Sequence, residues 1–173
     1  MNKILALLIL SLNLFGATFL VDQNESSIKF ETSKFFVVGI SGSFSQFEGV
    51  ITSNNQELTS INGTVNTVTI NTNNEKRDAH LKENDYFYIS KFPTIEFKSI
   101  SIKDNEMVAK ITIKEISKEV KFSIDNIKED NQKLEIDLSA NVDRQDFALN
   151  GSKSQIASNN IKITSKLVAY KKY

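Results

Sequence analysis

The sequence predicts an all-β fold in which about eight antiparallel strands close into a barrel, with one short helix packed over it. Apolar and polar residues alternate along most of the chain, which is typical of strands with one buried face. Short polar turns separate these segments, as expected between antiparallel neighbours, and closing the sheet removes its exposed edges. A sandwich of two sheets is the alternative that the same pattern allows.

The first residues have the pattern of a secretory signal peptide. Lys3 precedes an apolar run over residues 4–15, and the small residues Gly16 and Ala17 follow it. We therefore expect a signal peptide at 1–17 and one barrel domain at 18–173, located in the periplasm or secreted. The chain has no Cys for lipid attachment, so no permanent membrane anchor is expected.

Composition excludes several classes of partner. The chain carries 21 basic and 21 acidic residues with no basic stripe, so no nucleic-acid partner is expected. One His and no Cys cannot supply the usual ligand sets of a zinc site. We expect no metal and no cofactor.

The pattern in the first half of the chain predicts strands whose alternation is interrupted at two places. Residues 18–21 predict a short edge strand, and residues 27–38 predict a longer one. Phe44 and Phe47 are three apart, so a bend between them is needed for both to point inward. Residues 58–72 form another strand, with a change of phase between Val65 and Val68.

One helix is expected before the second half. Thr72 and Glu75 have the spacing of a capping box, which places the helix start just before Arg77. Pro93 lacks a donor N–H and suits the start of the next strand.

The second half alternates more regularly. The turns are expected at residues 104–105, 115–118 and 128–133. The strands between and after them are residues 92–102, 107–113, 120–124, 134–142 and 161–167. Residues 143–160 are a long polar segment, and a segment of that length is usually a lid or disordered.

Residues 77–97 carry the only histidine, His80, and the only proline, Pro93. This stretch resembles the signature of the YceI-like family at residues 77–81, 85–87 and 91–97. The similarity continues in chain order at residues 26–30, 42–44, 47–49, 111–120 and 144–147. Two departures affect turns: Ala148 and the pair Glu115-Ile116 stand where the family usually has glycine.

The resemblance implies an exported, elongated, lipocalin-like barrel with a helix over it. Its apolar lumen is expected to take one long isoprenoid or a similar single-tailed lipid, and a homodimer is compatible with it. The chain has 12 Phe and no Trp, and these rings either line such a lumen or fill a packed core. The candidate lining residues are Phe30, Phe36, Phe44, Phe47, Phe87, Phe92, Ile95, Phe97, Ile111, Ile113, Phe122, Leu138 and Phe147.

Five charged residues are candidates for contacts with a lipid head group. Arg77 and His80 share one face of the expected helix, whereas Asp78 does not. Arg144 and Asp146 form a similar charged group in the late segment. The alternative is that the arginines pair with the aspartates and hold the helix and the late segment against the barrel.

The sequence predicts a binding protein and no enzyme. A general base needs a positioned partner, and the chain has no second His, no metal set and no nucleophile elbow beside His80. Two alternatives remain open from the sequence. The same barrel could hold a fatty acid, a fatty amide or a quinone, or a barrel with a filled core could bind a protein partner.

Overall fold

The computed structural model describes residues 16–34, 38–150 and 158–173. Within these residues the chain forms eleven strands, one α-helix and two 3-10 helices. In order, they are β1 (Ala17–Val21), β2 (Ser27–Lys34), β3 (Val38–Phe44), β4 (Phe47–Asn54), β5 (Glu57–Asn66), η1 (Thr67–Thr69), β6 (Ile70–Asn71), α1 (Glu75–Leu81), β7 (Thr94–Lys103), β8 (Glu106–Ile113), β9 (Ile116–Glu129), β10 (Lys133–Asp143), η2 (Arg144–Phe147) and β11 (Asn160–Lys171).

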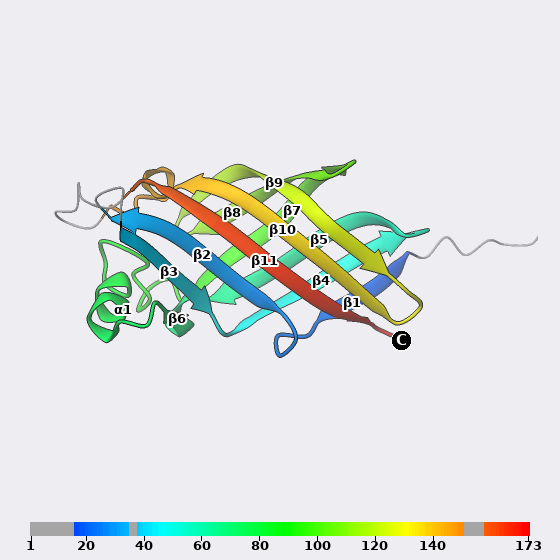
Figure 1. Ribbon diagram of the computed structural model, residues 1–173, viewed down its shortest axis with the longest axis horizontal. Helices are drawn as coiled ribbons and strands as arrows, with labels where there is room; N and C mark the ends of the chain where they lie inside the picture. Colours follow the sequence, from blue (N-terminus) through cyan, green and yellow to red (C-terminus); the bar gives the residue numbers. More distant parts are fainter. Residues whose placement is uncertain (1–15, 35–37, 151–157) are drawn as a thin grey trace, which may run out of the picture.

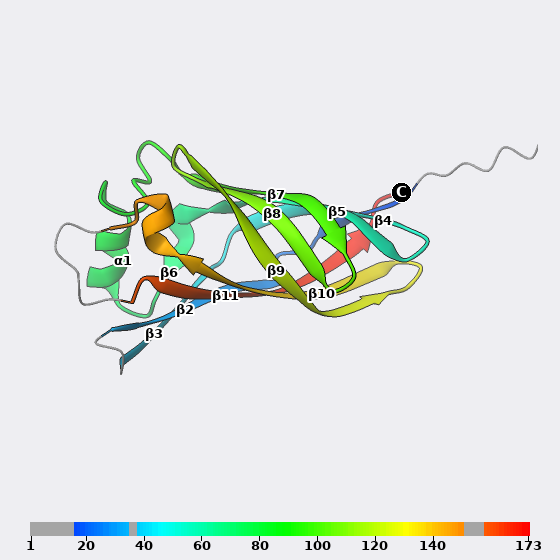
Figure 2. The same ribbon diagram turned by 90° about the horizontal axis from the view of Figure 1, so that it is seen from above.

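Eight strands form a closed antiparallel barrel, which confirms the predicted fold class. The order around the barrel is β1-β4-β5-β7-β8-β9-β10-β11, and pairing of β1 with β11 closes it. The barrel is elongated, and its long strands cross it obliquely (Figures 1 and 2). No helix within the described part of the chain is long and apolar enough to span a membrane.

Strand β1 was expected at a sheet edge, and that expectation was wrong. It lies between β4 and β11 and pairs with both. Strand β2 pairs with the first half of β11, at residues 162–166, while β1 pairs with its last residues, 169–171. Together β1 and β2 therefore occupy one strand position in the barrel wall, with an interruption between them.

The chain bends between β3 and β4, as the sequence predicts. Strand β3 ends at Phe44, β4 begins at Phe47, and both rings are buried. The prediction of one strand over residues 27–38 was wrong in its end. Lys34 pairs with Val38 across a hairpin, because β3 turns back antiparallel along β2.

The change of phase predicted between Val65 and Val68 is a 3-10 turn. Strand β5 ends at Asn66, and η1 turns Val68 outward before β6 pairs with β3. The capping box predicted from Thr72 and Glu75 is not formed. Asn74 caps α1 instead, because its side-chain oxygen accepts the N–H of Arg77.

The C-terminal hairpins follow the predicted alternation with one shift. The turn between β8 and β9 is Lys114-Glu115, with Ile113 paired to Ile116, so the turn predicted at residues 115–118 lies too late. A bulge in β7 between Ser99 and Ser101 turns Ile100 outward, which explains the change of phase in that strand.

Helix α1 and η2 both lie at one end of the barrel, the end at which β3 and β6 are drawn in Figure 1. The part of the late polar segment that the structure describes is packed, not extended into solvent. Phe147 is 1% exposed, and Arg144 and Leu149 are buried beside it. Residues 151–157, in the middle of the predicted lid, lie outside the described residues.

Ala148 ends η2 in the left-handed conformation, with φ 51 and ψ 38. This conformation is strained for a residue with a Cβ and unstrained for glycine. We expect Ala148→Gly to raise the free energy of unfolding by about 0.5–1 kcal/mol, since relief of strain exceeds the added entropy of the unfolded chain. Urea denaturation followed by circular dichroism measures this change.

A matched substitution in α1 provides the control for that measurement. Ala79 is exposed and lies in α1. Ala79→Gly should therefore lower the free energy of unfolding by about 1 kcal/mol. Equal destabilisation by both substitutions would show that the left-handed conformation at residue 148 costs nothing.

Candidate ligand-binding cavity

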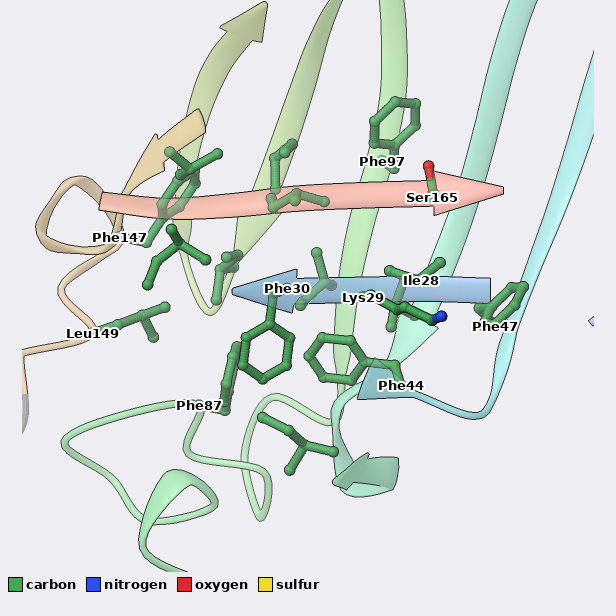
Figure 3. A pocket seen from close by; sticks show the side chains of 18 of the residues that line it. Ile28, Lys29, Phe30, Phe44, Phe47, Phe87, Phe97, Phe147, Leu149 and Ser165 are labelled. Carbon is green, nitrogen blue, oxygen red and sulfur yellow. The ribbon is translucent and has the colours of Figure 1, made fainter. Parts of the chain in front are cut away.

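The barrel encloses an apolar cavity of about 550 Å³ that begins under α1 and η2 and runs along the inside of the strands. This volume lies within the range of roughly 300–1,000 Å³ that is typical of small-molecule sites. Figure 3 shows Phe87, Phe147 and Leu149 toward one end and Phe47, Phe97 and Ser165 toward the other. The interior is therefore not a completely filled core.

Most of the predicted lining residues lie on this cavity. They are Phe30, Phe44, Phe47, Phe87, Ile95, Phe97, Ile111, Ile113, Phe122, Leu138 and Phe147. Phe36 lies among residues whose side chains the structure does not describe. Phe92 does not line the cavity. Its ring packs edge-on against Tyr88 at 5.8 Å and lies 4.8 Å from the ammonium of Lys91.

The sequence reasoning missed many of the aliphatic lining residues because it concentrated on phenylalanine. The additional apolar side chains are Val21, Ile28, Ile40, Ile61, Val65, Ile70, Leu81, Val142, Leu149, Ile161, Ile163 and Leu167. The signal that could have found most of them is the period of two, because they continue the inward phase of their strands.

Two glycines face each other across β4 and β5 in the wall of the cavity. Gly49 pairs directly with Gly63, and both line the cavity. A Cβ at Gly63 would lie 2.5 Å from the carbonyl oxygen of Glu48, so the close approach of the two strands requires glycine there. The missing side chains also leave space inside the barrel.

Three aromatic rings gather near the α1 end of the cavity. Phe44 lies 5.7 Å from Phe30 and 6.0 Å from Phe87, the latter edge-on. Gly42 makes this possible, because a Cβ at that position would lie 2.3 Å from the Phe30 ring. The rings come from β2, β3 and the segment after α1, so they join the helical cap to the barrel (Figure 3).

Arg77 and Asp78 meet at Thr72 and form no direct ion pair. Thr72 donates its hydroxyl proton to Oδ1 of Asp78 at 2.5 Å and accepts from Nε of Arg77 at 2.8 Å. Nη2 of Arg77 also donates to the carbonyl oxygen of Thr72 at 2.7 Å. Thr72 is buried, and this network fixes α1 to the end of β6. Arg77 also lines the cavity.

Removing the hydroxyl should loosen the helix. We expect Thr72→Val to lower the free energy of unfolding by about 1–3 kcal/mol, because it leaves polar groups of a buried network unpaired. Hydrogen exchange of residues 75–81 should accelerate more than exchange of β10. Thr94→Val, at the exposed start of β7, is the control and should change neither measurement.

His80 lies on the same face as Arg77 and also lines the cavity. Its Nε2 is 3.2 Å from Oδ2 of Asp85, and its ring packs edge-on against Tyr86 at 5.1 Å. The side chain is 56% exposed, so the cavity reaches solvent beside it. His80 thus has a positioning carboxylate at the mouth of an apolar cavity.

Arg144 is a buried cation in the cavity wall, only 6% exposed. Nη1 donates to the carbonyl oxygens of Leu149 at 2.6 Å and Asn150 at 3.3 Å, and Nε donates to that of Ser158 at 3.2 Å. Asp146, which was predicted in the same charged group, is exposed on η2, whereas the side chain of Arg144 is buried. Through these carbonyl oxygens Arg144 joins η2 to the start of β11.

Lys114 connects the β8–β9 turn to the same end of the barrel. Its ammonium donates to the carbonyl oxygen of Ala148 at 2.8 Å. Burial lowers the pKa of this ammonium below its ordinary value, and the Asp85 carboxylate partly opposes that shift. No group of three or more His, Cys, Asp or Glu side chains in the described ranges could hold a metal ion.

Comparison with known proteins finds relatives of the whole barrel. A family model described as the YceI-like domain matches residues 19–169. The UPF0312 protein SA2479 of Staphylococcus aureus (strain N315) is 29% identical over 140 residues, which cover 76% of this chain and 82% of that protein.

Two solved structures are similar in fold. The YCEI protein of Campylobacter jejuni is 25% identical, with a TM-score of 0.68 over 76% of this chain and 85% of that chain. A polyisoprenoid binding domain from Saccharophagus degradans has a TM-score of 0.72 at 10% identity, and the match covers 89% of this chain and 98% of that chain.

Proposed function

Because this chain belongs to the YceI-like family, we propose that it is an exported carrier that holds one long isoprenoid chain in the lumen of its barrel, for transport, storage or scavenging. It acts by binding and carries out no catalysis. The observation that carries this proposal is the cavity of about 550 Å³ inside an elongated barrel (Figure 1), whose lining is almost entirely apolar. The polyisoprenoid-binding domain that shares the fold supports the choice of ligand class.

The chemistry of the wall suits a chain more than a polar metabolite. Each CH₂ group that enters the lumen contributes roughly 0.8 kcal/mol of gross stabilisation. Ordering the chain and losing its translational freedom offset much of this gain. Affinity therefore grows with the length of chain enclosed, while specificity for the head group depends on a few polar residues.

Those polar residues lie at the α1 end. Arg77 and His80 line the cavity on one side of the mouth, and Arg144 lines it beneath η2. Cationic donors in this position favour a head group that accepts hydrogen bonds, such as a hydroxyl, carbonyl or phosphate oxygen. In the proposed complex, the tail points away from these residues into the barrel.

Extraction of the purified protein tests the proposal. The protein is isolated without detergent, its native mass is measured, and an organic extract is examined by mass spectrometry. We expect one isoprenoid chain per barrel. A fatty acid, fatty amide or quinone at the same ratio would overturn the isoprenoid assignment and retain the lipid-carrying barrel.

A bare native mass requires a second measurement with added ligand. Geranylgeraniol is titrated into the bare protein, and binding is followed by native mass spectrometry. Saturation at one molecule per barrel would support the carrier. Failure of geranylgeraniol and of the longer prenyl alcohols to bind would overturn it and favour a protein-binding role for the outer surface.

A further inference from the structure

The end of the barrel away from α1 is filled by side chains. Five large apolar residues there are at most 1% exposed and do not line the cavity. We call them the plug: Phe19, Ile51, Met107, Leu134 and Ile136. Protein interiors packed in this way have few voids larger than a water molecule. A ligand chain therefore cannot pass through the barrel from end to end.

Strand register places the plug directly beneath the cavity. Ile51 of the plug pairs with Ile61, which lines the cavity, and Met107 of the plug pairs with Phe122, which also lines it. The ring of Phe122 packs edge-on against Phe97 at 5.4 Å. Paired residues of neighbouring strands point to the same side of the sheet, so Met107 lies beside Phe122 inside the barrel. The Phe97–Phe122 pair therefore lies next to the plug and forms the floor of the lumen.

The other end of the lumen is its mouth. The exposed His80 lines the cavity there beside Arg77, and both come from α1. The α1 end is thus exposed beside His80 and carries the Arg77 side chain, and the other end is closed by the plug. This polarity fits one chain inserted tail first, with its head group at α1.

The volume limits how much of that chain is enclosed. An apolar cavity of about 150 Å³ holds benzene, which corresponds to roughly 25 Å³ for each carbon atom. On that scale, a lumen of about 550 Å³ encloses about 22 carbons, or about four isoprene units of five carbons.

We infer that this barrel measures chain length: it takes a single prenyl chain of about four isoprene units, whose tail ends on the Phe97–Phe122 floor. This inference rests on the proposed isoprenoid-carrying function and makes it specific. A chain of eight units would leave about half of its carbons outside the barrel, where they gain no burial.

Binding of prenyl alcohols of increasing length tests this inference. Bare protein is titrated with all-trans alcohols of two, three, four, six and eight units, and the dissociation constants are compared. We expect at least about tenfold tighter binding for each unit up to four, because each unit buries about five carbons. From four to eight units, the constant should change less than threefold. A continued increase in affinity up to eight units would overturn the inference.

A variant of the floor should move the limit. Phe97→Ala removes one ring, which is about the volume of one isoprene unit, so the last unit that improves affinity should become the fifth. Ile100→Ala is the matched control, because Ile100 lies on the same strand, points outward and is 53% exposed. Phe97→Leu deepens the lumen less, and it replaces Phe97→Ala in the same titration if the alanine variant does not fold. An unchanged limit in the folded floor variant would overturn the role of Phe97.

The two proposals fail in different ways. Failure of every alcohol to bind would contradict the carrier itself. Binding of all lengths without a limit near four units would contradict only the measurement of length. A series of linear fatty alcohols with the same carbon numbers separates enclosed volume from isoprenoid branching, since volume alone predicts a similar limit near 20 carbons.

Discussion

A Ser165→Phe variant should fold as the same barrel and bind a prenyl alcohol of 20 carbons at least about 100-fold more weakly. Ser165 lies on β11 and lines the cavity, and Figure 3 shows its side chain there, away from the helical end. It pairs with Ile28 and Leu138, which line the same cavity. A phenylalanine ring at this position would occupy space that the chain needs.

The size of the effect follows from the volume displaced. A ring takes about 150 Å³, which is the space of about six carbons of ligand. At roughly 0.8 kcal/mol for each CH₂, the gross loss approaches 5 kcal/mol. The ligand can slide toward the mouth and recover part of it, so a loss of about 2.7 kcal/mol, or 100-fold, is the smallest effect expected. Titration with geranylgeraniol measures it.

The neighbouring outward position supplies the control. Thr164 precedes Ser165 on β11 and points to the opposite face of the sheet. Thr164→Phe adds the same ring without filling the lumen, and its affinity should stay within about threefold of the parent. Equal affinities of the two variants would show that the chain does not occupy the space beside Ser165.

Replacing Arg144 with methionine should lower the free energy of unfolding by about 3 kcal/mol. The guanidinium donates hydrogen bonds to the carbonyl oxygens of Leu149, Asn150 and Ser158. Methionine leaves these acceptors without that donor at the α1 end of the barrel, and an unpaired acceptor that is buried costs about 1–3 kcal/mol. Thermal unfolding should move down by about 6–12 °C for a chain of this size.

Arg144→Lys distinguishes geometry from charge. Lysine keeps the positive charge but lacks the rigid fork that reaches several acceptors at once, so it should recover little of the lost stability. Lys162→Met, at an exposed position of β11, should leave stability within about 0.5 kcal/mol. Full recovery by lysine would show that charge alone holds this end of the barrel.

The same variant separates a structural role from a role in binding. If Arg144 contacts the head group, the folded methionine variant should lose affinity for geranylgeranyl phosphate more than for geranylgeraniol. If Arg144 only holds η2 to β11, the ratio of the two affinities should not change.

The fold could be predicted from the sequence because the barrel places every strand in the same environment. One face meets the interior and the other meets water, so the alternation in Leu134, Ile136, Leu138 and Ala140 is preserved in their burial. The bend between Phe44 and Phe47 was also predictable, because two buried residues three apart cannot share a face of a regular strand. The position of β1 was not, since five residues carry no information about which neighbours they pair with.

The contacts of the candidate site could be predicted from the sequence less well than the fold, for two reasons. The partners of Arg77 and Arg144 are a hydroxyl and backbone carbonyls, and any residue supplies a carbonyl, so no sequence pattern marks them. Thr72 was noticed only as a capping residue. Its hydroxyl instead joins Arg77 and Asp78, because Asn74 caps α1.

The inward face of most strands, most of the turns and the presence of one helix over the barrel could therefore be predicted, because these features depend on local alternation and local turn chemistry. The place where the lumen ends could not be predicted, because it depends on packing between strands that are distant in the chain. Ile61 lines the cavity and Ile51 belongs to the plug, although both are inward-facing isoleucines on adjacent strands. The difference is set by the side chains that face them across the barrel, since an inward residue borders a cavity only where the opposite wall does not reach it.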